Sequence, residues 1–278
     1  MAVLPWLYDG RAVALAVIGV FAFGQGINLG YHRLLTHRSL KLPRWLERCF
    51  VLLAICCLQE SPATWVAWHR AHHAHSDRDR DPHSPLISFL WGHMAWLAYP
   101  RDVDGVLGGY RRYAQDILQD PFYRRLEHQP VLIYLIYLAH AALFFAAGFG
   151  LGWAEGGSAA SGLRLGLSFF VWAVVLRTVA VWHITWSVNS LTHLFGYRSH
   201  DTDDNSRNNW LVGLIAVGEG WHNNHHHDQA SATTQHRWWE LDFTYYLIRL
   251  LETLGLATEV VRPRHKRRAA AISGEAPR

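Results

Sequence analysis

The chain has 278 residues, of which 50% are apolar, and its formal net charge at neutral pH is +4. Its mean hydropathy is only −0.01, so long apolar runs must alternate with strongly polar segments. The positive charge follows the apolar runs and forms no separate basic domain, which argues for lipid headgroups and against nucleic acid as the partner. No Pro- or Ser-rich linker and no internal repeat divides the chain. We therefore expect one domain over residues 1–278, with a flexible basic tail from about residue 262.

Three apolar runs are long enough to cross a bilayer, which takes about 20 helical residues. They cover Val13 to Leu29, Val131 to Trp153, and Leu165 to Val188. A shorter run, Cys49 to Leu58, is about half a span and predicts an interfacial or buried helix. Core helices of a soluble protein are the alternative, but three such runs separated by polar segments favour an integral membrane protein. We predict an all-α fold with about three to four transmembrane helices.

The basic residues indicate the orientation of these spans, because cytoplasmic loops retain Lys and Arg. Residues 32–130 hold 13 of the 26 basic residues and residues 189–278 hold ten. Both polar segments are therefore expected in the cytoplasm, together with the basic sequence RPRHKRR. With three spans, this orientation places the N-terminus outside. We expect a multi-pass protein of a bacterial cell membrane.

Nine of the 19 histidines fall in four motifs close to the ends of the apolar runs. The motifs are HRLLTH (His32, His37), HRAHH (His69, His72, His73), NSLTH (Asn189, His193) and HNNHH (His222, His225, His226). Residues spaced i, i+3 and i+4 share a helical face, so each HxxHH motif should present its three imidazoles together. His32 and His37 are about 140° apart around an α-helix. They are expected to converge only if the helix frays or if two metals share the site.

The number of histidines bears on the number of metals. One tetrahedral zinc needs about four ligands, so nine histidines suit two metals with four or five ligands each. Imidazole binds iron, copper and zinc alike, and ligand type alone does not identify the metal. Two metals beside lipid, without thiolates, indicate oxygen chemistry on an apolar substrate and favour iron. A non-catalytic metal-binding or transport protein is the alternative from another functional class.

Several acidic residues lie close to these motifs. A carboxylate that accepts a hydrogen bond from a ligating imidazole orients the ring and raises its basicity. We assign that role to Glu219, three residues before His222, with a helix N-terminal acid as the alternative. For Asp77, Asp79 and Asp81 in DRDRDP we favour a solvated, self-neutralising loop over support of the metal ligands.

At these motifs the sequence resembles the membrane-bound fatty acid desaturases, specifically the acyl-CoA (stearoyl-type, Δ9) branch. That family carries HxxxxH, HxxHH and HxxHH boxes in this order, and the similarity covers roughly residues 25–250. It includes GYHRLLTHRS, HRAHHAHSDRDRDPHSP, NSLTHLFGYRSHDTDDNSRNN and AVGEGWHNNHH. The resemblance implies a cytoplasmic helical cap with a di-iron centre bound by nine histidines, which match His32, His37, His69, His72, His73, His193, His222, His225 and His226. It also implies that Asn189 reaches iron through a water.

The implied reaction is O₂-dependent desaturation, in which two electrons are used to introduce a cis double bond, at Δ9 in this branch, into a saturated acyl chain. The implied cofactors are two iron ions, with O₂ as co-substrate. An unactivated C–H bond has no acidic proton, so the iron carries the chemistry and the protein supplies position. An acyl-lipid hydroxylase on the same scaffold is the nearest alternative. The chain has no cytochrome b5 or ferredoxin segment, so we expect a separate electron donor of one of these types, with its reductase.

Two features depart from the pattern of this branch. Only one span precedes His32, where the branch usually has a hairpin, so we expect that a helix is missing or that the start is shortened. The HRAHH motif follows TWVAW, whereas animal acyl-CoA enzymes resemble EWARD there, so the basic residue that helps to hold CoA would fall at Ala67. The acyl carrier therefore stays open between CoA, a phospholipid and acyl carrier protein.

Further histidines and tryptophans complete the list of candidates. His75, His83 and His93 are expected not to bind metal, and His227 is left unassigned because only the resemblance excludes it. Candidates to line an acyl tunnel are Trp65, Trp68, Trp182 and Trp186.

Overall fold

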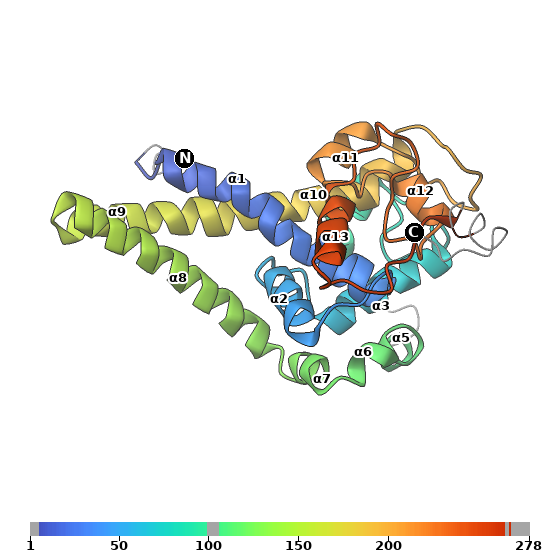
Figure 1. The fold of residues 1–278 in the computed structure, drawn as a ribbon, viewed down its shortest axis with the longest axis horizontal. Helices are drawn as coiled ribbons and strands as arrows, with labels where there is room; N and C mark the ends of the chain where they lie inside the picture. The colour runs from blue at the N-terminus through green and yellow to red at the C-terminus, as the bar shows by residue number, and fades with distance from the viewer. Residues whose placement is uncertain (1–5, 99–105, 265–266, 268–278) are drawn as a thin grey trace.

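The computed structural model describes residues 6–98, 106–264 and 267. Within these residues every regular element is helical, and extended segments pair only in isolated bridges. Long helices form a bundle at one end of the molecule, and short helices form a cap at the other (Figure 1). The all-α prediction is confirmed. The basic tail expected from about residue 262 lies largely outside the described residues.

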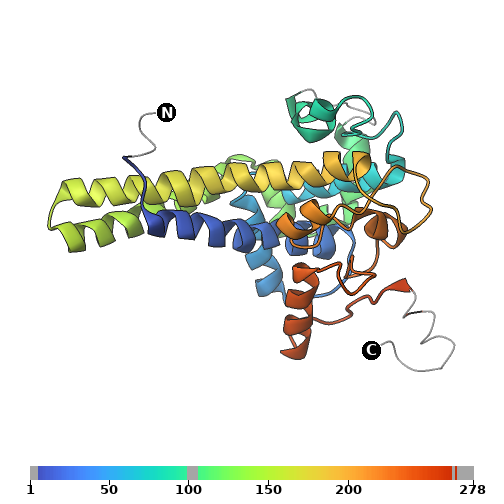
Figure 2. The same ribbon diagram turned by 90° about the horizontal axis from the view of Figure 1, so that it is seen from above.

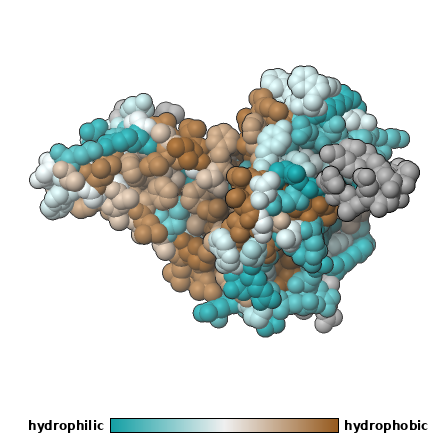
Figure 3. Space-filling model, viewed as in Figure 1, coloured by the Kyte–Doolittle hydropathy of each residue, from teal (hydrophilic) through white to brown (hydrophobic). Residues whose placement is uncertain are grey.

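Three helical segments are long and apolar enough to cross a membrane: Gly10–Thr36, Val131–Gly156 and Ala159–Leu194. The first joins α1 (Gly10–Gln25) to η1 (Gly26–Thr36), and the second is α8 (Val131–Gly156). The third joins α9 (Ala159–Phe169), η4 (Phe170–Leu176) and α10 (Arg177–Leu194). These segments confirm the three predicted spans. Figure 3 shows apolar surface over the bundle and the adjoining side of the cap, and mainly polar surface over the rest of the cap.

Glycines allow α8 and α9 to pack closely as a hairpin. A Cβ atom at Gly148 would lie 2.7 Å from the Leu165 carbonyl oxygen, and one at Gly152 would lie 2.5 Å from the Ser161 carbonyl oxygen. Both distances are shorter than van der Waals contact. Lipid provides little hydrophobic drive for helix association, so this close backbone approach supplies the packing energy instead.

Two of the spans, the first and the third, continue beyond the bilayer into the cap. The third span has 36 residues, which as a helix is about 54 Å, against a hydrocarbon thickness of about 30 Å. Its last turns carry Asn189 and His193 into the cap. The first span likewise ends at η1, which carries His32.

A buried cation joins the spans to one another. The Arg177 guanidinium donates to the Cys56 carbonyl oxygen at 2.9 Å and lies 2.8 Å from the His140 Nε2 atom. It also lies 4.0 Å from the centroid of the Phe23 ring. A charge at membrane depth is costly without such partners. Arg177 therefore links α1, α8 and α10 to the end of α2 (Arg44–Ile55).

The cap contains the remaining helices. In the first half of the chain these are α2, α3 (Pro62–His75), η2 (Trp91–Ala95), α4 (Trp96–Ala98), α5 (Val106–Gly109), η3 (Tyr110–Ala114), α6 (Gln115–Leu118) and α7 (Pro121–His128). The C-terminal part adds α11 (Trp210–Ile215), α12 (His222–His227) and α13 (Phe243–Thr253). The short apolar run beginning at Cys49 forms most of α2. Val51 and Ala54 of α2 are buried in a cluster with Ile27 and Tyr31 of η1, as expected of a buried helix.

Candidate metal centre

A change of helix type brings the first two histidines together. η1 is a π-helix, in which each amide bonds to the carbonyl five residues earlier, and the His37 amide donates to the His32 carbonyl at 3.1 Å. Residues five apart therefore lie on the same side, and the two imidazole centroids are 4.7 Å apart. The sequence spacing indicates a frayed helix or two metals as the conditions for convergence and does not indicate a π-helix. The wider helical turn is sufficient.

The nine histidines of the four motifs gather in two clusters. Cluster 1 consists of His32, His37, His69, His73 and His225, and cluster 2 consists of His72, His193, His222 and His226. Within each cluster, one nitrogen from every residue lies within 4.8 Å of the others. The five-plus-four division agrees with the count expected for two metals.

Each HxxHH motif serves both clusters, which the sequence did not indicate. On α3, His69 and His73 are four residues apart and face cluster 1, whereas His72 faces cluster 2. On α12 the roles are exchanged, because His225 faces cluster 1 while His222 and His226 face cluster 2. The two helices thus share the ligand sets, and neither cluster forms without both.

Ring nitrogens point at one another inside both clusters. The His225 Nε2 atom lies 3.1 Å from Nε2 of His32 and 3.0 Å from Nε2 of His73. In cluster 2, Nε2 atoms of His222 and His193 are 3.1 Å apart. Four further ring nitrogens are buried and have no hydrogen-bond partner within the described ranges, namely His37 Nε2, His72 Nε2, His73 Nδ1 and His226 Nε2.

These nitrogens are suited to metal ions. Burial lowers the pKa of His73, His222 and His225 well below the ordinary value, and neighbouring imidazoles lower it further, so the rings are neutral. A neutral ring has one nitrogen lone pair, and several lone pairs converging in a dry interior are costly unless a cation accepts them. The chemistry of the donor set therefore fits a metal ion at each cluster.

Four carboxylates hold the opposite sides of the rings. The Nδ1 atom of His32 lies 2.9 Å from Glu219 Oε2, and the pairs in cluster 2 are His72–Asp81 at 3.0 Å, His193–Asp77 at 2.9 Å and His226–Asp204 at 2.6 Å. When Nδ1–H donates to the carboxylate, the Nε2 lone pair faces the cluster. In the described part of the chain, cluster 1 has one such carboxylate and cluster 2 has three.

The interpretation of DRDRDP as a solvated loop is wrong for two of its three acids. The side chains of Asp77 and Asp81 are only 4% and 0% exposed, because the loop after α3 folds back against the cluster. Burial would raise the pKa of Asp81, but His72 lowers it below its ordinary value, so the carboxylate is charged. Asp79 is exposed. The regular alternation of Asp and Arg in the sequence does not indicate which of the three aspartates is exposed.

Glu219 supports a different histidine from the one beside it in sequence. It contacts His32 of η1 and not His222, and the Arg33 guanidinium donates to it at 2.8 Å. Arg33 also donates to both carboxylate oxygens of Asp242 at 2.9 Å, so this ion network connects the first span to the C-terminal part of the cap. Burial alone would raise the pKa of Glu219, yet Arg33 and His32 lower it to about 2. Sequence reasoning missed Arg33 and Asp204, although both lie inside stretches that resemble the family.

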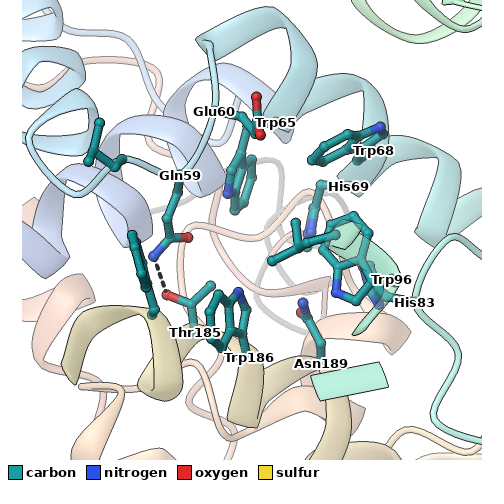
Figure 4. Close-up of a pocket in the computed structure, with 13 residues that line it drawn as sticks. Gln59, Glu60, Trp65, Trp68, His69, His83, Trp96, Thr185, Trp186 and Asn189 are labelled. Carbon is teal, nitrogen blue, oxygen red and sulfur yellow. Dashed lines mark hydrogen bonds between the residues drawn. The ribbon is translucent and has the colours of Figure 1, made fainter. Parts of the chain in front are cut away.

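A cavity of about 290 Å³ reaches the clusters from the side of α10. All four tunnel candidates, Trp65, Trp68, Trp182 and Trp186, line it, together with Leu58, Gln59, Glu60, His69, His83, Trp96, Leu97, Thr185 and Asn189. Figure 4 shows His69 and Asn189 toward one end and the hydrogen bond from Gln59 to Thr185, 2.9 Å long, at the other. The walls are mainly aromatic and apolar, as in pockets for apolar ligands.

The loop between α2 and α3 closes one part of this cavity. Leu58 and Glu60 have φ angles of +50° and +68°, which are strained for residues with a Cβ. Two hydrogen bonds hold the loop: the Trp182 indole donates to the Cys57 carbonyl at 2.6 Å, and the Tyr31 hydroxyl donates to the Glu60 carbonyl at 3.2 Å. Gln59 is therefore held against α10.

Comparison with known proteins decides the family. Residues 10–257 match the family model for fatty acid desaturases. The chain is 42% identical over 259 residues to an sn-2 palmitoyl-lipid 9-desaturase of Nostoc sp. (strain 36), covering 92% of this chain and 84% of the relative. The chain belongs to the fatty acid desaturase family. This desaturase is thus an O₂-dependent oxidoreductase of acyl chains, and the family predicted from the histidine motifs is confirmed.

The names of other relatives of the desaturase differ in the acyl carrier and in the position of the double bond. It is 42% identical over 262 residues to an sn-1 stearoyl-lipid 9-desaturase of Anabaena variabilis, covering 93% of this chain and 87% of the relative. It is 41% identical over 255 residues to an acyl-CoA 5-desaturase of Anemone leveillei, covering 91% and 72%. Membership of the family therefore establishes desaturation but not the double-bond position.

The other histidines that the structure describes lie outside the two clusters of the desaturase. His75 Nε2 lies 3.2 Å from the Tyr113 hydroxyl, and His93 Nδ1 lies 3.0 Å from the Ser190 hydroxyl. His83 stacks on His72 at 4.3 Å and could share a third group of ligand atoms with His72 and Asp81. Burial lowers the pKa of His83 to about 3. His227 stacks on His200, with a centroid distance of 4.0 Å.

Proposed function

We propose that this protein binds two iron ions and introduces a cis double bond at Δ9 of a saturated acyl chain carried by a membrane lipid. The observation that carries the proposal is the division of nine histidines into clusters of five and four. The names of two similar proteins, both acyl-lipid 9-desaturases, support the lipid carrier and the position. The acyl-CoA 5-desaturase relative defines the competing carrier and position.

In this proposal each cluster holds one iron. The five histidines of cluster 1 and the four of cluster 2 are the ligands, and Asn189 reaches iron through a water beside cluster 2, one helical turn before His193. Bound iron would supply the activation of O₂ and the removal of two hydrogens from adjacent methylenes. The side chains of the protein hold the metals and position the chain.

The carboxylates prepare the ligands for this task. Glu219, Asp77, Asp81 and Asp204 each accept the Nδ1–H of one histidine, which fixes the ring and directs its Nε2 lone pair into the cluster. Because Glu219 is itself held by Arg33, His32 keeps its orientation even though its helix is irregular.

The cavity supplies the position of the reacting methylenes. Methylenes in one chain are chemically alike, so selectivity must come from geometry. A chain that enters the cavity passes His69 and Asn189 and then meets the Gln59–Thr185 hydrogen bond. The indole walls exclude water from the reacting carbons, and Gln59 limits how far the chain advances beyond the metal ligands.

The side chains at the position where a cation for CoA is expected favour a lipid over a CoA thioester. Ala67 is buried and apolar at the position where the resemblance expects a basic residue for CoA. Its neighbour Trp68 is an indole that lines the cavity. Neither side chain provides a charge for the phosphates of CoA.

The same proposal covers the cellular arrangement. The basic residues follow the cap, which supports a position of the clusters on the cytoplasmic side of the membrane. Residues 1–278 then form one desaturase domain, and two electrons come from a separate ferredoxin or cytochrome b5 type donor with its reductase. The three candidate spans support a multi-pass protein.

Product analysis tests this function. The protein is expressed in a host that lacks Δ9 desaturation, and the lipids are analysed by mass spectrometry with the double bond located and the lipid class resolved. We expect Δ9 monounsaturated chains in intact membrane lipids, and none with the His72→Ala variant. Hydroxylated chains without an alkene would support a hydroxylase instead. Double bonds confined to the acyl-CoA pool, or at Δ5, would refute the proposed carrier or position.

A further inference from the structure

One segment of the cap exposes apolar side chains to an unusual degree. Leu86, Ile87, Phe89, Leu90 and Met94 are all between 42% and 59% exposed. Residues 82–100 contain no Asp, Glu, Lys or Arg, although they belong to the polar segment 32–130. Contiguous exposed apolar surface of this kind marks a site of contact with a membrane or a partner.

This segment, residues 86–98, is fixed against the third membrane span. His93 lies 3.0 Å from the Ser190 hydroxyl through Nδ1 and 3.0 Å from His183 Nδ1 through Nε2. His183 and Ser190 are both in α10, and the helix between them is about 10 Å long. In Figure 2 the teal segment lies beside yellow α10, on the side of the cap from which the long helices extend. The apolar run predicted for the third span ends at Val188, between His183 and Ser190, so the segment lies beside the end of that run.

The inner side of the same segment is a wall of the cavity. Trp96 and Leu97 line it, together with Trp68 and Trp186. Trp96 packs edge-on against Trp68 with a centroid distance of 5.0 Å. Residues 86–98 therefore have the cavity on one side and exposed apolar side chains on the other.

We propose that residues 86–98 lie in the boundary between lipid headgroups and acyl chains, and that a lipid-linked chain enters the cavity from the bilayer past this segment. The entry route rests on the proposed lipid-linked substrate, whereas the membrane contact does not. Continuity with the surface of α10 and the lack of charge favour lipid over a protein partner, whose binding surfaces usually carry a polar rim. On the opposite flank of the bundle (Figure 2), α13 and the residue that follows it also expose apolar side chains, namely Phe243, Leu250 and Leu254.

Fluorescence quenching tests the membrane contact without any need for activity. A Cys49→Ser background removes the exposed thiol, since Cys56 and Cys57 are buried. Leu90→Cys and the control Asp201→Cys are labelled with an environment-sensitive fluorophore in the full chain, reconstituted in phospholipid nanodiscs. We expect the label at residue 90 to be blue-shifted, quenched by brominated lipids and protected from iodide. The label at the fully exposed Asp201 should behave in the opposite way.

Two other results would overturn the proposal. Quenching of the residue 90 label by iodide would show that the segment faces water. Protection from both quenchers would show that a protein surface, such as a second copy of the chain, covers it. Either result is independent of product analysis, which alone decides whether the protein is a lipid desaturase.

A second variant tests entry. Phe89→Lys with Leu90→Lys changes only exposed side chains, so the fold and the iron content should be retained. We expect the KM for lipid-embedded substrate to rise severalfold with little change in kcat, and Asp201→Lys to leave both unchanged. An unchanged KM in a correctly folded variant would refute entry past this segment.

Discussion

The two histidine clusters differ in what lies behind the ligands. Cluster 1 has five histidines and one supporting carboxylate, Glu219, whose charge is shared with Arg33. Cluster 2 has four histidines and three supporting carboxylates, Asp77, Asp81 and Asp204. An anionic carboxylate behind an imidazole raises the basicity of that ligand. A metal at cluster 2 would therefore have fewer ligands in stronger anionic surroundings.

The difference also indicates where substrate and metal would meet. Asn189 lies one helical turn from His193 of cluster 2 and lines the cavity, whereas cluster 1 reaches the cavity through His69. Cluster 2 supplies one histidine fewer than cluster 1, and Asn189 lies on its side. Metals bound at the two clusters would therefore not be equivalent, and the following variants separate them.

The largest effect is expected from removing a ligand of either cluster. His72 and His73 are adjacent in α3 but belong to different clusters. We expect His72→Ala and His73→Ala each to abolish desaturation, a loss greater than the roughly 100-fold that follows removal of a supporting carboxylate. Each variant should also lose one iron of two, which metal analysis and Mössbauer spectroscopy of ⁵⁷Fe-loaded protein measure.

The control is His75→Ala in the same helix, which removes a side chain that contacts Tyr113 and no cluster. It should keep both irons and full activity. Double-bond formation by His72→Ala, or identical Mössbauer spectra for the two ligand variants, would refute the assignment of these residues to two metals.

A smaller effect is expected from the carboxylates of cluster 2. Asp77→Asn and Asp81→Asn remove a negative charge behind His193 and His72 while keeping the size of the side chain. We expect each to lower iron affinity or activity by about 10- to 100-fold. Asp79→Asn is the matched control, because Asp79 lies in the same loop and is exposed. Equal effects at all three positions would mean that the loop acts through its overall charge.

The sequence predicted the spans well, but not how far they extend. Length and apolar composition identified all three runs, because a bilayer demands both. The predicted third run ended at Val188, whereas its helix continues to Leu194. The added turn is polar and is stabilised by contacts within the cap, which hydropathy does not register. The same limit hid the membrane-facing segment 86–98, whose run is too short to resemble a span.

Histidine spacing predicted which residues gather, but not how they divide. The π-helix η1 packs against α2, and no local residue pattern predicted its wider turn. The division of HRAHH between two clusters depends on the position of α12 relative to α3, which is set by tertiary packing and not by local sequence. DRDRDP was misinterpreted because alternating charges are compatible with both exposure and burial, and only the return of the loop against α3 makes Asp77 and Asp81 different from Asp79.

Glu219→Gln should have a smaller effect than the aspartate variants. The amide oxygen still accepts a hydrogen bond from His32, so the ring orientation is kept while the charge is lost. We expect about a tenfold loss of iron affinity, confined to cluster 1. The variant also leaves Arg33 with Asp242 as its only remaining carboxylate among the described residues, so the melting temperature should fall. An undiminished iron affinity would show that orientation alone, and not charge, matters at this cluster.

The smallest effect is expected at His227, the third histidine of the HHH run. Its neighbour His226 contributes to cluster 2, whereas His227 turns away and stacks on His200 at 4.0 Å. Sequence distance could not separate them, because His227 is as far from His222 as His37 is from His32. The π-helix makes that spacing effective at His32, whereas α12 is α-helical and its sixth residue, His227, lies away from the clusters. His227→Ala should therefore keep both irons, change activity less than about twofold, and cost about 1 kcal/mol of stability from the lost ring contact. Loss of an iron in this variant, by metal analysis beside His226→Ala, would place His227 among the ligands.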